Sequence, residues 1–141
     1  MFVNVTILED KIKQKIDYLV GKPYGFSQRL RMGRIGSKKM EIVDYSIAFH
    51  DYFSYTQDLD YGNIEIRPLG IIIRFRFLTE SHAWIIPFYK LSFFKHQKGL
   101  SFHADGHYLC FKDPYKHNRP FIDKIMQMKV DYDEAHKMPP Y

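Results

Sequence analysis

The alternating pattern of residues 71–77 limits the possible folds more than any other feature of the sequence. Apolar residues occupy every second position there, and a period of two places alternate side chains on opposite faces of a β-strand. Pro68 and Gly70 indicate a break just before this run. We therefore predict a half-buried antiparallel strand with one solvated side. One face carries Ile71, Ile73, Phe75 and Phe77, and the other carries Ile72, Arg74 and Arg76.

The neighbouring segments extend the predicted sheet over most of residues 41–112. Residues 81–94 are rich in aromatic and branched side chains, and Pro87 indicates an edge or a bend within them. Residues 41–63 have two interpretations, and we favour a strand that runs into a loop. Val43, Tyr45, Ile47 and Phe49 alternate as in a strand, whereas Tyr45, Phe49 and Tyr52 keep helical spacing.

The stretch FHADGHYLCF contains both a turn signal and the spacing of metal ligands. A two-residue turn at Asp105-Gly106 would separate His103 from His107 and would keep the apolar residues of both strands on one face. A three-residue loop would place the two histidines opposite each other, but it would mix polar and apolar residues on a face. Because a slip of one residue inverts the faces of a strand, the cleaner pattern predicts the two-residue turn and no metal site. The predicted pairs are Ala104 with His107, His103 with Tyr108, Phe102 with Leu109, and Leu100 with Phe111.

An amphipathic helix is predicted near the N-terminus, over about residues 7–20. Thr6 and Glu9 have the spacing of a capping box, in which each side chain satisfies the free backbone amide of the other residue. Gly21 can adopt the left-handed conformation that ends a helix. The apolar stripe consists of Leu8, Ile12, Ile16 and Leu19.

A second amphipathic helix is predicted near the C-terminus, over about residues 120–136. Asn118 can cap it, and Pro120 is tolerated in a first helical turn. We expect its apolar stripe to pack on the sheet. That stripe consists of Phe121, Ile125, Met128 and Tyr132.

Length and composition favour a single domain, residues 1–141, with a core rich in aromatic side chains. The 141 residues are 45% hydrophobic and 17% aromatic, which argues against disorder away from the ends. Cys110 is the only cysteine, so an internal disulfide and a multi-thiolate zinc site are excluded. No segment reaches the roughly 18 apolar residues of a membrane helix, and the N-terminal stretch lacks the features of a signal peptide. We therefore expect a soluble, cytoplasmic protein.

The formal charge of +5 is unevenly distributed, and residues 22–40 contain basic residues without any acid. Glycines at positions 25, 33 and 36 disfavour a regular helix there, so a basic loop is expected. Such a loop could bind lipid headgroups; nucleic acid is less favoured because the aromatic interleaving of a single-strand binder is missing. The alternative is a loop that is simply solvated. The candidate anion-binding residues are Arg29, Arg31, Arg34, Lys38 and Lys39.

The predicted elements form a curved sheet followed by one amphipathic helix. Within the sheet, a glycine-led strand, an aromatic segment and a hairpin follow one another. These are Gly70-Ile71-Ile72-Ile73, Trp84-Ile85-Ile86-Pro87-Phe88, Leu91, and Leu100-Ser101-Phe102 with Leu109-Cys110-Phe111. In these residues, and in the helix that follows, the chain resembles the bacterial pleckstrin-homology-like (PH-like) domains. The resemblance implies a split barrel with a helix at one end, and it implies a binding or assembly scaffold rather than an enzyme.

We thus expect an α+β protein with an antiparallel, barrel-like sheet, an N-terminal helix and a capping C-terminal helix. An enzymatic hypothesis rests only on the histidines, because no spacing of Ser, Cys and His matches a catalytic motif. We expect a non-catalytic module without a cofactor or metal that binds a protein partner or itself through an exposed aromatic surface. Phe93 and Phe94, followed by Lys95, could form such a surface, and core packing is the alternative for them. The second hypothesis is an anionic-ligand binder that uses residues 29–39.

Overall fold

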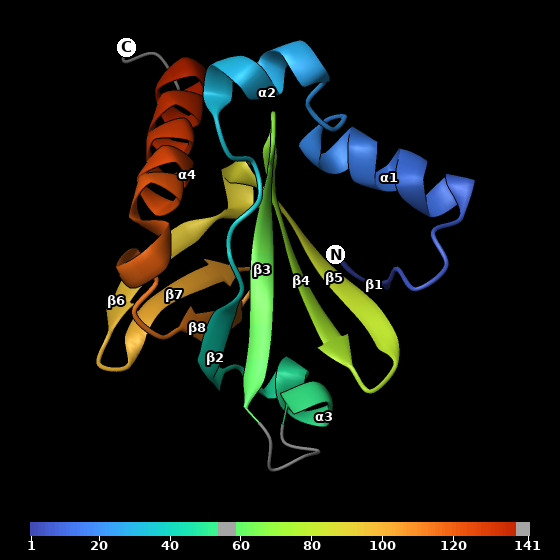
Figure 1. Ribbon diagram of the computed structural model, residues 1–141, viewed down its shortest axis with the longest axis vertical. Helices are drawn as coiled ribbons and strands as arrows, with labels where there is room; N and C mark the ends of the chain where they lie inside the picture. The colour runs from blue at the N-terminus through green and yellow to red at the C-terminus, as the bar shows by residue number, and fades with distance from the viewer. Residues whose placement is uncertain (54–58, 138–141) are drawn as a thin grey trace.

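Antiparallel pairing joins eight strands into one sheet within the described part of the chain, residues 1–53 and 59–137 (Figure 1). In this computed structural model the strand order is β1-β5-β4-β3-β2-β8-β7-β6. The predicted α+β class, antiparallel sheet and terminal helix are confirmed. The strands are β1 (Phe2–Asn4), β2 (Met40–Tyr45), β3 (Asp60–Arg67), β4 (Gly70–Phe77), β5 (Glu80–Pro87), β6 (Ser92–His96), β7 (Gly99–Ala104) and β8 (His107–Phe111). The helices are α1 (Asp10–Val20), α2 (Phe26–Met32), α3 (His50–Phe53) and α4 (Tyr115–His136), with short 3₁₀ turns η1 (Ile47–Phe49) and η2 (Phe88–Lys90).

The sheet is open, with β1 and β6 as its two edges. In Figure 1, β6, β7 and β8 run across the direction of β3, β4 and β5. After Pro87 the chain leaves the sheet and turns through η2 before β6 begins, so the bend predicted at this proline is confirmed.

β4 is the strand predicted from the alternating pattern, and it pairs with β3 and β5. Ile73 lies opposite both Ile64 and Trp84, and all three side chains are buried in the main core. The predicted break is the turn before Gly70. A Cβ atom at Gly70 would lie 2.3 Å from the carbonyl oxygen of Ile86, so this close approach of two backbones requires glycine.

The other face of β4 is only partly solvated, which corrects the prediction. Ile72 is fully buried because α1 packs on this face through Ile16 and Val20. Figure 1 shows α1 beside β4 and β5. Arg76, near the end of β4, is exposed as predicted. The sheet therefore has a second, smaller core beneath α1.

α1 begins at Asp10 rather than at residue 7, and Thr6 does not cap it. The pairing of β1 with β5 brings Thr6 beside Ser81, whose N–H donates a hydrogen bond of 2.8 Å to the Thr6 hydroxyl. Leu8 consequently lies outside the helix and is exposed. Gly21 has a φ of 87° directly after the helix, so the predicted helix end is confirmed.

α2 occupies residues for which we expected an irregular basic loop. Gly25 is its N-cap, and its N–H donates to Gln28 Oε1 at 2.9 Å. Gly33 follows the helix with a φ of 79°. The prediction was wrong because the glycines lie at the two ends of the helix, where they are favourable, rather than inside it.

The ambiguous segment 41–63 contains both strand and helix. β2 ends at Tyr45, and η1 and α3 follow it. Phe49 and Phe53, four residues apart, are both buried in the main core, and a helical turn places them on one side. The predicted loop is therefore wrong as far as Phe53, and residues 54–58 lie outside the described residues.

The two-residue turn at Asp105-Gly106 is confirmed, and all four predicted pairs of the hairpin are present. The two residues have φ values of 53° and 79°, as a type I′ turn requires. His103 lies opposite Tyr108, and His107 lies on the other face of the hairpin. The separation of the two histidines follows from this register.

α4 starts at Tyr115, earlier than predicted, and ends at His136 as predicted. Asn118 does not cap the helix; with φ −129° and ψ 22° it forms a kink, and Pro120 lies in the first turn after it. The described side chains that pack on the sheet include Ile122 in addition to the predicted stripe. Phe121, Ile122 and Ile125 are buried, and Met128 and Tyr132 are partly buried against the main core.

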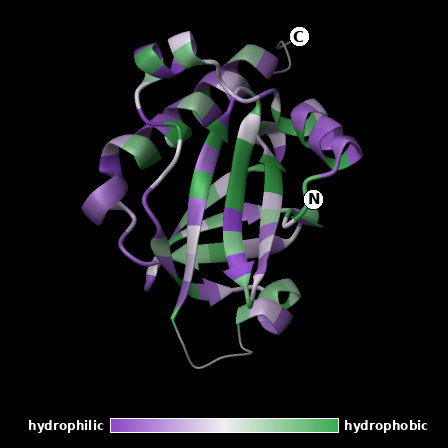
Figure 2. Cartoon of the chain, turned by 45° about the vertical axis from the view of Figure 1, so that its right-hand side comes forward, coloured by the Kyte–Doolittle hydropathy of each residue, from purple (hydrophilic) through white to green (hydrophobic). Residues whose placement is uncertain are grey.

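Apolar residues follow the central strands, and polar residues are frequent along the helices (Figure 2). No helix within residues 1–53 and 59–137 combines the length and the hydropathy that spanning a membrane demands.

Arg67, at the end of β3, is buried and ties α1 to the sheet. Its guanidinium donates to the Asp17 carboxylate at 3.1 Å, to the Gly21 carbonyl at 2.8 Å, and to the Glu65 carboxylate. Arg74 donates to the other oxygen of Glu65 at 2.5 Å. Burial by itself would raise the pKa of Glu65, but the hydrogen bonds and charges of the two arginines outweigh it and leave the pKa below its usual value.

We predict that Arg67→Ala lowers the free energy of unfolding by about 3 kcal/mol at neutral pH, because it leaves the Asp17 carboxylate without its arginine and removes one of the two arginines that bind the partly buried Glu65. Since Glu65 has a lowered pKa in the folded protein, its stabilising contribution is complete above the unfolded pKa and is lost as the pH falls through the folded pKa. The measurement is urea unfolding at several pH values between neutral and acid.

The control is Arg76→Ala, which removes the same side chain from an exposed position of β4. It should cost less than about 1 kcal/mol. Equal losses in the two variants, or a difference between them that does not shrink in acid, would contradict the proposed role of the network.

Candidate functional site

The five basic residues predicted to bind anions are all exposed, but they do not form one site. Arg29 and Arg31 lie on α2, and Arg34 and Lys38 lie on the segment that connects α2 to β2. Lys39 lies over an aromatic ring, with its Nζ 4.6 Å from the centre of Tyr61.

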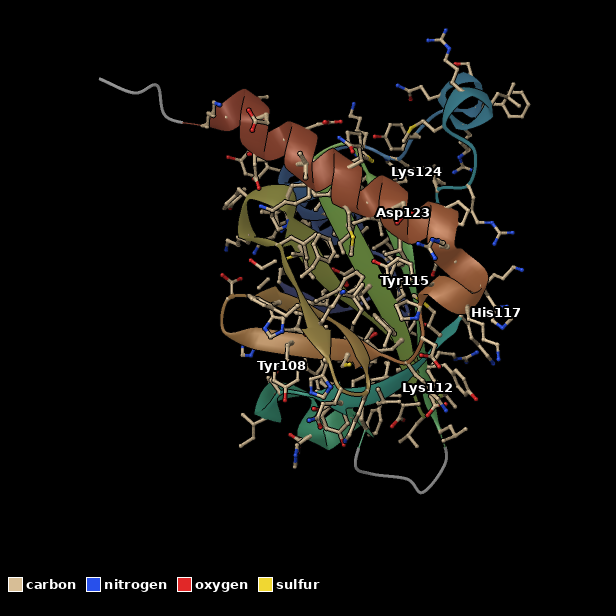
Figure 3. The ribbon with its side chains drawn as sticks, turned by 90° about the vertical axis from the view of Figure 1, so that its left-hand side faces the viewer. Tyr108, Lys112, Tyr115, His117, Asp123 and Lys124 are labelled. Carbon is tan, nitrogen blue, oxygen red and sulfur yellow. The ribbon has the colours of Figure 1, made fainter. Side chains whose placement is uncertain are left out.

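Arg34 and Lys38 line a hollow of about 560 Å³, called here the basic hollow, together with His117 and Lys124 of α4. In Figure 3, His117 and Lys124 lie along α4, and α2 is above them. Among the described residues that line the basic hollow there is no Asp or Glu. The structure therefore brings two of the five predicted residues together with two that the sequence analysis missed.

Lys124 holds the segment after α2 in place. Its Nζ donates to the carbonyl oxygen of Met32 at 2.5 Å and to that of Arg34 at 2.9 Å. Burial lowers the pKa of Lys124, because desolvation disfavours the charged ammonium group. An anion in the basic hollow would restore a counter-charge beside it. No local pattern in the sequence marks this lysine, since its partners lie far away along the chain.

Asn118, at the kink of α4, also holds the segment between α2 and β2 in place. Its side chain is buried; its Oδ1 accepts a hydrogen bond of 2.9 Å from the Lys38 N–H, and its Nδ2 donates to the Lys38 carbonyl at 3.5 Å. Asn118, which was predicted to cap the helix, thus connects α4 by hydrogen bonds to the segment between α2 and β2. These contacts fix the backbone of Lys38 at the wall of the basic hollow and leave its side chain exposed.

A second hollow, of about 690 Å³, lies between the β6–β7 hairpin and the start of α4. Its apolar lining comes from Phe93 and Leu100 of the hairpin, and from Pro114, Tyr115 and Met126 on the side of α4. We call it the apolar groove; Figure 3 labels Tyr115. The lining also includes His96, Gly99 and three charged residues: Lys95, Asp113 and Lys116.

β6 borders the apolar groove and is an edge of the sheet. Within the described residues it pairs with β7 alone, so one side of its backbone forms a free edge. Phe93 packs on Phe102 with 5.1 Å between ring centres, whereas Phe94 is 56% exposed. Phe93 thus packs partly against the core, as one of the two interpretations predicted, whereas Phe94 faces solvent.

His103 and Cys110, two of the groups considered for metal binding or catalysis, make contacts within the fold. Within the described residues, no three His, Cys, Asp or Glu side chains gather as metal ligands. His103 has its Nε2 2.8 Å from the Ser101 hydroxyl, and burial together with the nearby His96 lowers its pKa. Cys110 is fully buried, and burial, aided by the charge of Asp44, raises the pKa of its thiol to about 11.

Comparison with known proteins finds no matching family model, no matching curated protein and no matching solved structure. Function is therefore inferred from the chain's own geometry.

We predict that Cys110 reacts with a thiol reagent such as DTNB at neutral pH only after unfolding. The thiolate is the reactive form, and a pKa of about 11 keeps the buried thiol protonated. The measurement is the rate of labelling in buffer and in denaturing urea. Full labelling of the folded protein within minutes would contradict the burial of this side chain and would reopen a chemical role for it.

Proposed function

We propose that this protein is a non-catalytic interaction module of the cytoplasm that binds an extended segment of a protein partner along the free edge of β6. The observation that supports this best is the position of the apolar groove directly beside an edge strand. A strand edge offers a row of backbone donors and acceptors, and a neighbouring hollow can select alternate side chains of an added strand.

The register of the β6–β7 hairpin indicates which backbone groups a partner would use. His96 and Gly99 flank the two-residue turn, and such a turn is closed by a hydrogen bond between the flanking residues. Hydrogen-bonded and non-hydrogen-bonded pairs alternate along an antiparallel ladder, so the backbone of Lys95 points away from β7. Lys95 also lines the apolar groove, so the outward amide and the hollow lie together.

The lining of the apolar groove suggests the chemistry of the bound segment. Phe93, Leu100 and Met126 would receive apolar side chains, which on an added strand occur at every second position. Two lysines, Lys95 and Lys116, line the apolar groove against one acid, Asp113, so acidic residues would be favoured near the lysines. We therefore expect an extended segment that alternates apolar residues with polar or acidic ones.

We also propose that the sheet is a PH-like split barrel that is open between its two edge strands, β1 and β6. The path of the chain supports this: β2 to β5 follow one another as antiparallel neighbours, β6 to β8 do the same, and β2 joins the two groups by pairing with β8. A helix then completes the chain. PH-like scaffolds suit the proposed binding role, although a fold by itself does not establish function.

Binding of an anionic ligand is the second proposed function, and the basic hollow is the observation that favours it. Arg34, Lys38 and His117 present cationic or potentially cationic groups around one hollow, and Lys124 lies in its wall. A phosphate group, carried by a lipid headgroup in preference to a nucleic acid, has the matching charge and acceptor atoms.

We predict that a phage library of random twelve-residue peptides yields ligands for the edge of β6, and that Lys95→Pro weakens their binding. Proline removes the outward N–H and obstructs an added strand without removing a hydrogen bond to β7. The matched control is Lys95→Ala, which removes the same charge but keeps the amide. Fluorescence anisotropy with a selected peptide should give an affinity loss of about tenfold or more for Lys95→Pro relative to Lys95→Ala.

A second variant, Met126→Glu, tests the groove without touching the strand, because it places a carboxylate among the apolar lining residues. This variant should bind the same peptides with lower affinity. Sedimentation of the free protein shows whether a second copy uses this edge, since a dimer held by β6 would become monomeric with Lys95→Pro. Failure to select any peptide, or equal affinity of the two Lys95 variants, counts against the proposal.

We predict that inorganic phosphate stabilises the protein against heat more than chloride does at equal ionic strength. At about ten times its dissociation constant a ligand adds about 1.4 kcal/mol of stability. Arg34→Ala with Lys38→Ala should remove this gain, whereas the control pair Lys11→Ala and Lys13→Ala, on the exposed side of α1, should keep it. Identical responses in both double variants would show that phosphate acts through net charge rather than through the basic hollow.

A further inference from the structure

α2 presents large apolar side chains to solvent. Phe26 and Leu30 are 79% and 72% exposed, and their spacing of four residues places them on the same face of the helix. The other residues of α2 are exposed as well, except Met32, which is partly buried. Figures 1 and 3 both place this helix at one end of the molecule. Two large apolar side chains on one exposed helix face form a candidate surface for contact with an apolar environment.

The orientation of α2 is set by contacts on its other side. Met32, six positions after Phe26, packs partly against the main core. Lys124 binds the carbonyl oxygens of Met32 and Arg34, which are at the end of the helix and just beyond it. The Gln28 side chain caps the helix start through the Gly25 N–H. The Gln28 bond lies within the helix, so the outward direction of the apolar pair is a consequence of the contacts of Met32 and Lys124 at the C-terminal end.

The charge around α2 indicates which kind of surface contacts the face that carries Phe26 and Leu30. Residues 18–40 contain no Asp or Glu. Their six basic side chains are all exposed, and within the described chain none of them forms an ion pair. A second copy docked symmetrically would oppose arginine to arginine, which disfavours self-association through this face. The six residues are Lys22, Arg29, Arg31, Arg34, Lys38 and Lys39.

We propose that α2 docks this protein on an anionic lipid bilayer, with Phe26 and Leu30 inserted among the acyl chains and the neighbouring arginines bound to headgroup phosphates. Arg29 precedes Leu30 and Arg31 follows it, so cationic groups flank the apolar pair on the helix surface. This inference rests on the anion-binding function proposed for the basic hollow, which contains Arg34 and Lys38, and it specifies the ligand as a lipid surface. The binding of peptide by β6 is independent of it.

The test is cosedimentation with vesicles of phosphatidylcholine and phosphatidylserine, and with vesicles of phosphatidylcholine alone. The wild-type protein should bind the anionic vesicles, and binding should weaken as salt rises. Phe26→Ser with Leu30→Ser should reduce the affinity about tenfold or more with the charge unchanged. The matched control is Ile47→Ser with Leu78→Ser, which removes two exposed apolar side chains from other parts of the surface and should bind normally.

A second readout reports insertion directly. Phe26→Trp should show a blue-shifted emission and quenching by brominated lipids, whereas the buried Trp84 supplies a constant background. Thermal unfolding of each variant serves as the control for the fold, and the melting temperatures should match that of the wild-type protein.

The outcomes separate the inference from the function on which it rests. If the Phe26 and Leu30 double variant binds anionic vesicles as the wild type does, while Arg29→Ala, Arg31→Ala and Arg34→Ala together abolish binding, the insertion is overturned and the anion-binding function stands. If the wild-type protein binds no anionic vesicle at low salt, membrane docking is overturned, and the phosphate experiment alone decides the anion-binding function. A dimer that the serine variants dissociate would assign this face to a second copy and also overturn the inference.

Discussion

The pairing of β2 with two partners holds this fold together. β2 pairs with β3 on one side and with β8 on the other, so it joins the β3–β5 meander to the β6–β8 unit. The contact between Ile42 and Phe111 closes a long loop, whose entropic cost is offset by the burial of both side chains in the main core. Between Ile42 and Asp44 the register shifts, which allows the sheet to bend there.

The candidate binding surfaces lie at the borders of this framework. Just before β2, the Ser37 N–H donates to the Ile64 carbonyl at 2.8 Å, and the Ile66 N–H donates to the Ile35 carbonyl at 2.7 Å. The chain is thereby held along β3, and Lys38 reaches Asn118 at the kink of α4. The same helix lines the basic hollow near this kink and the apolar groove on the side of the β6–β7 hairpin. α4 thus supplies one wall of each surface, while its buried face stabilises the core.

Sequence patterns predicted the elements whose two faces differ in polarity. β4 and the hairpin at Asp105-Gly106 were predictable because period two and a two-residue turn define their registers locally. The start of α1 was not predictable, because the pairing of β1 with β5 places the Thr6 hydroxyl in a hydrogen bond with Ser81. α2 was missed because its glycines were interpreted as interruptions, although they are its end residues. Of the candidate anion site, Arg34 and Lys38 were found from composition, but Lys124 and His117 could not be, because only the packing of α4 brings them close.

By itself, the sequence determined the strand β4, the hairpin register and the approximate extent of the terminal helices, since these depend on periodicity and on turn chemistry between near neighbours. It also determined that residues 18–40 carry basic charge without acid. The tertiary structure alone decided that Ile72 is buried under α1, that the basic residues are divided between a helix and a hollow, and that Phe26 and Leu30 face outward. The physical reason is that burial and exposure depend on which distant segment covers a side chain, and such contacts leave no periodic signal in the chain itself.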